Sequence, residues 1–140
     1  MMSMWVKTTL LTIEKTKYRS MMFRKFISLA VEFRNLNNYH GVMIVLSALE
    51  SGPITRLRHT IEAAMRNAKL ETLYAELKLL TDTNKNWINL RECINAQMCL
   101  KEDRHANFFP VVPYIGIILS DLVFIEEGNS NEVQGTFHSV

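Results

Sequence analysis

Two adjacent glutamates, Glu126 and Glu127, follow the apolar run YIGIILSDLVFI and precede Gly128. The run favours a helix, and Gly128 is a typical residue for its end. Because the C-terminal end of a helix carries partial negative charge, an acid there is unfavourable by a few tenths of a kcal/mol up to about 1 kcal/mol. The simplest interpretation is a pair of solvated side chains. The alternative is a functional role, since residues that break a local rule often mark functional sites.

Metal and nucleophile chemistry lack support in the sequence. The four histidines and two cysteines are His40, His59, His105, His138, Cys93 and Cys99. No histidine lies at a metal-ligand spacing from another histidine or from a cysteine. The C-x5-C spacing of the cysteines matches neither a zinc knuckle nor a redox pair. The chain contains no G-x-S-x-G, no Walker loop and no glycine-rich dinucleotide turn. We therefore expect no metal, no cofactor and no covalent chemistry, and we interpret the cysteines as reduced thiols.

Two further polar stretches have structural explanations that suffice. The loop LNNYHG clusters amide and imidazole side chains, and Asn37 and Asn38 could simply cap a helix and form a turn. The stretch SGPITRLRHT is typical of one helix stopping and another starting. Neither stretch indicates a function by itself.

Composition limits the class of protein. The chain has 140 residues, is 48% hydrophobic, and its 16 basic and 14 acidic residues leave a net charge of +2. That is enough apolar content for a core, and the absence of a basic block argues against a nucleic-acid partner. No window approaches the roughly 20 apolar residues of a membrane span, and the N-terminus does not resemble a signal peptide. We expect a cytoplasmic protein without direct membrane insertion.

The elements that position these residues are predicted to be helices. Residues 22–35 carry apolar side chains at helical spacing, namely Phe23, Phe26, Ile27, Ala30 and Val31. The stretch VMIVLSALES is apolar nearly all round and should be buried. Further helices are expected from Pro53, over KLETLYAELKLLT, from Asn84, and over the run that ends at Gly128. Residues 99–109 look like a loop, and residues 130–140 like a disordered tail. The predicted class is all-α, with one folded unit over residues 1–129.

Three ordered stretches carry a resemblance to a known family. They are FRKFISLAVEFRNLNNYHGVMIVLSALESGPITRLRHTIE (23–62), NWINLRECI (86–94) and PVVPYIGIILSDLVFIEEGN (110–129). Together they resemble the catalytic domain of Ras-family guanine-nucleotide exchange factors, shared by the son-of-sevenless, Ras-GRF and Rap exchange proteins. The resemblance implies an irregular all-α domain, truncated here at both ends because the family domain extends further upstream and downstream.

The family's mechanism implies roles for six residues. Such proteins release nucleotide from a small GTPase by inserting a helical hairpin beside the phosphate site and holding switch II in an apolar pocket. The first hairpin helix matches residues 113–127, where Val123 matches the apolar side chain at the magnesium site and Glu127 the acid near the phosphate loop. The switch II positions match Met43, Trp87, Tyr114 and Ser120. For Met43 and Trp87, ordinary core packing is the alternative.

The sequence also departs from the family pattern. Relatives often have Asn where this chain has Glu50, some have Leu in place of Val123, and the loop between Ile94 and Pro110 is longer than in the nearest patterns. The function implied is nucleotide exchange on a Ras-like small GTPase, in small-GTPase signalling, with any membrane recruitment through other regions or partners. The alternatives are a GTPase-binding or decoy fragment without exchange activity, and a non-functional truncated product.

Overall fold

The protein is all-α, as predicted, in a computed structural model that describes residues 2–99, 110–129, 132–133 and 136–137. The helices of this described part are α1 (Met2–Thr12), α2 (Thr16–Asn35), α3 (Tyr39–Leu49), α4 (Gly52–Thr55), α5 (Arg58–Met65), α6 (Ala68–Leu80), α7 (Asn84–Cys99) and α8 (Ile115–Gly128). Two-residue strands β1 (Glu132–Val133) and β2 (Thr136–Phe137) pair antiparallel after α8. Whether residues 130–140 form a disordered tail remains a prediction.

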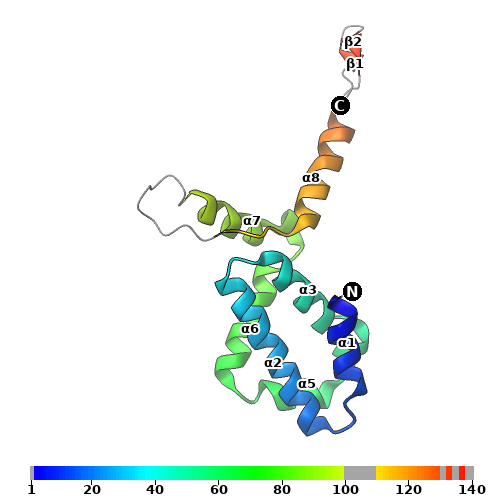
Figure 1. Cartoon of the computed structure of the whole chain (residues 1–140), viewed down its shortest axis with the longest axis vertical. Helices are drawn as coiled ribbons and strands as arrows, with labels where there is room; N and C mark the ends of the chain where they lie inside the picture. The colour runs from blue at the N-terminus through cyan, green and yellow to red at the C-terminus, as the bar shows by residue number, and fades with distance from the viewer. Residues whose placement is uncertain (1, 100–109, 130–131, 134–135, 138–140) are drawn as a thin grey trace.

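Helices α1 to α6 form a bundle around one apolar core, with α2 packed against α1, α3, α5 and α6 (Figure 1). The amphipathic face predicted for residues 22–35 supplies Phe23, Phe26, Ile27 and Ala30 to this core, and each is buried. Helix α3 is buried on most sides, as its uniform hydrophobicity indicates. We refer to α1–α6 as the body.

A second, smaller apolar cluster joins the body to α7 and α8. Its buried members are Tyr39, Leu80, Leu90 and Ile117, which come from α3, α6, α7 and α8 in turn. Figure 1 shows α7 at one end of the body and α8 projecting beyond it. We refer to α7, residues 110–114 and α8 as the arm.

The loop between α2 and α3 receives the chain segment that leads into α8. Asn37 adopts a left-handed backbone with φ of 53°, and the Asn38 side chain caps α3 by accepting a hydrogen bond from Gly41 N at 2.9 Å. Val112 then forms a bridge to this loop: its N–H donates to Asn37 O, and its carbonyl accepts from Tyr39 N, both at 3.0 Å. The predicted capping role is confirmed for Asn38, and the loop also holds the base of the arm.

The helix start near Pro53 is confirmed, as is a helix over KLETLYAELKLLT. The start at Asn84 is confirmed only as the first residue of the α7 segment, because Lys85, Asn86 and Trp87 have left-handed backbone and the regular helix follows them. Helix α2 begins earlier than the predicted 22–35 segment, and α1 was not predicted at all. Cys99 ends α7, so the predicted loop is wrong at its first residue, and residues 100–109 lie outside the described residues. No helix in the described part is both long and apolar enough to span a membrane.

Candidate functional site

Helix α8 exposes most of its apolar side chains. Val123 is 49% exposed, Leu122 56% and Phe124 63%, and within the described chain Ile117 is the one buried residue of this helix. An apolar surface of this kind marks an interaction site more often than a solvated one. Helix α8 is therefore the first candidate for contact with a partner.

Three of the predicted site residues share one side of α8. A helix turns about 100° per residue, so Ser120, Val123 and Glu127 fall within roughly 60° of one another. Glu126 and Glu127 are both exposed, and neither forms an ion pair with a described residue. The side that carries Val123 and Glu127 therefore combines an apolar side chain with a free carboxylate one turn further on.

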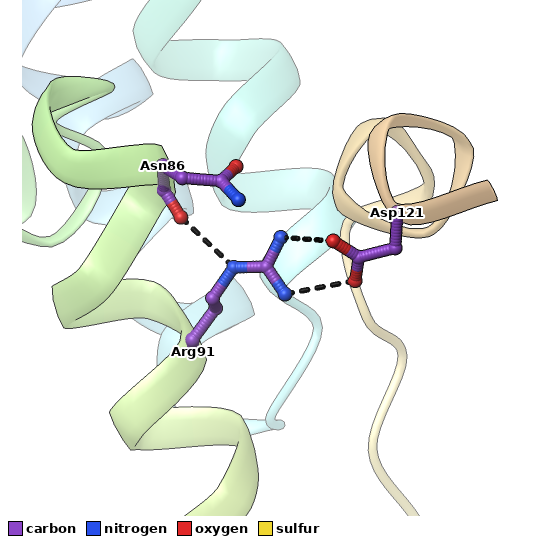
Figure 2. Close-up of polar contacts among 3 residues, drawn as sticks. All are labelled: Asn86, Arg91 and Asp121. Carbon is purple, nitrogen blue, oxygen red and sulfur yellow. Dashed lines mark hydrogen bonds and ion pairs between the residues drawn. The ribbon is translucent and has the colours of Figure 1, made fainter. Parts of the chain in front are cut away.

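A different side of α8 is anchored. Ile117 is buried in the second cluster, and Asp121 lies about 160° around the helix from Val123. Asp121 accepts two hydrogen bonds from the Arg91 guanidinium of α7, at 2.7 and 2.8 Å (Figure 2). These hydrogen bonds hold the pKa of Asp121 below its usual value and raise the pKa of Arg91 above its own. The anchors leave Val123 and Glu127 turned away from the body.

Three of the four predicted switch II residues lie together where the arm meets the body. Met43, Trp87 and Tyr114 all pack on the second apolar cluster, and the Trp87 and Tyr114 rings meet edge-to-face with centroids 6.0 Å apart. The His40 ring stacks on the Tyr114 ring, with centroids 6.1 Å apart. The core-packing alternative thus describes part of their role, since Met43 and Trp87 are half-buried in this cluster.

Two polar atoms in this cluster have no partner within the described chain. Trp87 Nε1 and His40 Nδ1 are both buried and unpaired. A buried donor without a partner is unfavourable by about 1–3 kcal/mol. Such atoms beside a half-buried aromatic cluster suit a surface that another molecule completes.

The backbone that carries Trp87 is strained. Lys85, Asn86 and Trp87 have φ of 50°, 56° and 54°, a left-handed turn inside the segment assigned to α7. This conformation is unfavourable by roughly 1–2 kcal/mol for each non-glycine residue. The Arg91 Nε donates a hydrogen bond to Asn86 O at 2.8 Å, and this contact stabilises the turn. Strain of this kind is commonest where a functional geometry needs it.

Tyr114 connects the aromatic cluster to α8. It precedes the first residue of the helix, and a Cβ added at Gly116 would lie 2.4 Å from its ring. The ring therefore covers the first turn of α8 at a position that only glycine leaves open. Val123, Glu127, Trp87 and Tyr114 all belong to the arm, and Met43 of α3 packs on the second apolar cluster beside Trp87 and Tyr114.

Sequence reasoning did not assign a role to Arg91, Asp121 or His40. The sequence contains a signal for Arg91 and Asp121. Arg91 interrupts the apolar stripe of NWINLRECI, and Asp121 is the single acid inside YIGIILSDLVFI. A charge within an apolar run indicates a partner, although the partner's identity depends on the tertiary fold. Glu50, where relatives often have Asn, forms an ion pair with Lys78 Nζ at 3.1 Å.

The surface is unlike a small-molecule or metal site. Two hollows of about 550 and 440 Å³ lie beside α6 and α7, and none of the six predicted site residues lines either. Within the described ranges, no cluster of three or more histidine, cysteine or acidic residues could hold a metal ion. The predicted residues are instead exposed or half-buried on the arm and beside it, which suits contact with a macromolecular partner.

Comparison with known proteins identifies the family. The model of the RasGEF domain matches residues 1–139. Ras guanine nucleotide exchange factor W of Dictyostelium discoideum is 38% identical over 134 residues, which cover 94% of this chain and 10% of that protein. Ras guanine nucleotide exchange factor A of the same organism is 32% identical over 133 residues, 94% of this chain and 20% of that protein.

A mammalian relative gives the same result. The Ras-specific guanine nucleotide-releasing factor RalGPS1 of Mus musculus is 35% identical over 124 residues, 89% of this chain and 19% of that protein. The chain therefore belongs to the RasGEF domain family, the family of guanine-nucleotide exchange factors for Ras-like GTPases. It spans between 10% and 20% of the length of these three relatives.

Proposed function

We propose that this chain promotes release of guanine nucleotide from a Ras-like small GTPase by inserting α8 beside the nucleotide. The observation that carries the proposal is the geometry of α8: one side is anchored through Ile117 and Asp121, and another presents Val123 and Glu127 to solvent. Family membership supplies the partner class. The chain would act as a regulator of the GTPase and would break no covalent bond.

Val123 would act on the magnesium ion of the GTPase. Magnesium requires nearly octahedral ligation by oxygen atoms, and an apolar side chain offers none. An isopropyl group placed at that position would therefore displace the ion and exclude the water that could replace it. Loss of magnesium removes charge compensation from the bound phosphates and weakens nucleotide binding.

Glu127 would compensate the emptied phosphate site. The phosphate-binding loop presents backbone N–H groups and a lysine at a helix N-terminus, and this arrangement attracts anions. A carboxylate that approaches it stabilises the nucleotide-free state. By linkage, a ligand that binds the empty GTPase more tightly than the loaded one lowers nucleotide affinity by the same factor.

Met43, Trp87 and Tyr114 would hold switch II, with Ser120 as a hydroxyl contact on α8. A half-buried aromatic cluster can accept an apolar or aromatic side chain, the kind of contact that dominates interface energetics. The unpaired Trp87 Nε1 is also a donor that a carbonyl of the bound segment could satisfy. Binding of switch II to these residues would direct α8 to the nucleotide.

The test measures release of a fluorescent guanine nucleotide from Ras, Rap and Ral proteins mixed with the chain. Val123→Ala removes two methyl groups, worth about 1.6 kcal/mol, and should slow release about tenfold. Glu127→Gln removes a charge-assisted contact and should slow release about tenfold as well. Leu122→Ala is the matched control for Val123→Ala, and Glu126→Gln is the matched control for Glu127→Gln. Both controls should leave the rate of release unchanged.

Three results would oppose the proposal. Binding to nucleotide-free GTPase without faster release would make the chain a GTPase-binding fragment. Equal effects of the controls and the test variants would mean that α8 contributes general hydrophobicity or charge and that the assigned side is wrong. Absence of both binding and release with all three GTPases would overturn the proposal entirely.

A further inference from the structure

Arg91 makes three hydrogen bonds at once, and they reach two separate parts of the arm. Its Nη1 and Nη2 donate to the two carboxylate oxygens of Asp121 at 2.8 and 2.7 Å, and its Nε donates to the carbonyl of Asn86 at 2.8 Å. Figure 2 shows the guanidinium lying between the two acceptors. The guanidinium is a planar fork whose donors point in fixed directions, so it can donate to both acceptors at once. We refer to this arrangement as the Arg91 fork.

Each acceptor belongs to one half of the proposed GTPase-binding surface. Asn86 is the central residue of the left-handed turn that places Trp87 against Tyr114. Asp121 follows Ser120 on α8 and belongs to its anchored side, opposite Val123. The turn is strained, and α8 buries only Ile117 among its described residues, so hydrogen bonds with a fixed direction can help to set the geometry of both halves.

We propose that Arg91 is a positioning residue that couples the two halves of this surface, setting the angle of α8 and the conformation at Trp87 together. This inference rests on the proposed function for its effect on exchange, while the coupling itself is a property of the free chain. Movement of α8 that breaks the Asp121 contact would release the Asn86 carbonyl, and relaxation of the Trp87 turn would loosen α8.

The role concerns geometry more than stability. The side chains of Arg91 and Asp121 are 27% and 43% exposed, and ion pairs with this degree of solvent contact contribute little to folding. Helices α1 to α6 carry the main core without them. Loss of the fork should therefore change the position of α8 while the body stays folded.

The test uses Trp87 as its own reporter. In a Trp5→Phe background Trp87 is the remaining tryptophan, so the fluorescence reports on the surroundings of this one residue. Asp121→Asn acts on α8, at a side chain whose hydrogen bonds in the described chain go to Arg91, and should shift the Trp87 emission maximum. Arg91→Lys keeps the charge and loses the fork, and it should give the same shift. Arg34→Lys alters the Arg34–Glu76 pair of the body and should give none.

Exchange provides the second readout. Arg91→Lys and Asp121→Asn should each slow nucleotide release about tenfold, and the double variant should be no worse than either single one, as expected for residues that act as a unit. The melting temperature should stay within a few degrees of the parent.

Unchanged Trp87 emission in Asp121→Asn would overturn the coupling, as would effects of the two substitutions that simply add. If the parent chain itself speeds no release, the proposed function fails and the fluorescence comparison still decides the coupling. A large fall in melting temperature for both variants, matched by Arg34→Lys, would assign Arg91 to general stability and would also overturn the inference.

Discussion

The body and the arm differ in what holds them together. The body buries fifteen apolar residues in one cluster, several of them completely, including Ile27, Val45 and Leu49. The arm relies on a smaller cluster with four buried members, on the Val112 bridge and on the Arg91 fork. The body is stabilised by burial, which is non-directional, whereas the arm is held by contacts that require a particular geometry.

This difference explains where function can reside. Apolar residues of the body contribute their hydrophobicity to folding, and those of α8 remain available to a partner. Native proteins are stable by about 5–15 kcal/mol, so a body with fifteen buried apolar residues can tolerate an arm that contributes little. Substitutions in the two regions should therefore have separable effects on folding and on binding.

The largest expected effect is on folding of the body. Phe23→Ala removes a buried ring from the main core and should lower the free energy of unfolding by about 3–5 kcal/mol. Leu122→Ala, on the exposed surface of α8, should change it by no more than about 0.5 kcal/mol. Urea denaturation of both variants checks the contrast, and similar losses would show that α8 is part of the same core.

The next effect is on binding at the base of the arm. Trp87→Ala should weaken binding to nucleotide-free GTPase by about 2–4 kcal/mol if Trp87 is an interface anchor. Calorimetric titration gives the affinity, and denaturation of the same variant gives its stability. An equal loss of folding stability with no separate effect on binding would assign Trp87 to the core and would blur the boundary between arm and body.

The smallest effect concerns pH and belongs to the body. Burial, with a smaller effect from the Glu50 carboxylate, raises the pKa of Tyr74 from 10.0 to about 12. The ring also contacts Phe23, and the Lys78 ammonium lies 5.6 Å from its centre.

The folded state holds the Tyr74 proton more tightly than the unfolded state does. The contribution of the protonated Tyr74 to the free energy of unfolding is therefore complete below pH 10 and is lost as the pH rises toward about 12. Urea midpoints measured across this range should fall less steeply for Tyr74→Phe than for the parent. Identical slopes would show that burial of this phenol does not influence folding.

Much of the body could be predicted from periodicity. The spacing of Phe23, Phe26 and Ile27 and the uniform hydrophobicity of residues 42–49 specify which faces are buried, because burial follows local pattern there. Helix α1 was missed because threonines and a lysine interrupt its apolar residues. The left-handed turn was missed because Lys85 and Trp87 carry no preference for positive φ.

The candidate site was predictable only in part. Val123, Glu127 and the aromatic residues came from the resemblance to the family, and the structure places them on the arm and at its base. Arg91 and Asp121 are thirty residues apart, and no local rule pairs a charge on one helix with a charge on another. Such pairs depend on the crossing of α7 and α8, which the tertiary fold decides.

The bridge between Asn38 and Val112 has a consequence for the order of folding. It closes a chain segment that contains α3 to α7, and the entropy lost on closing a loop increases with its length. The local helices and the body contacts close shorter segments and can form first. The arm should therefore dock after the body has folded, and amide hydrogens of Tyr39 and Val112 should exchange with solvent sooner than those of α2.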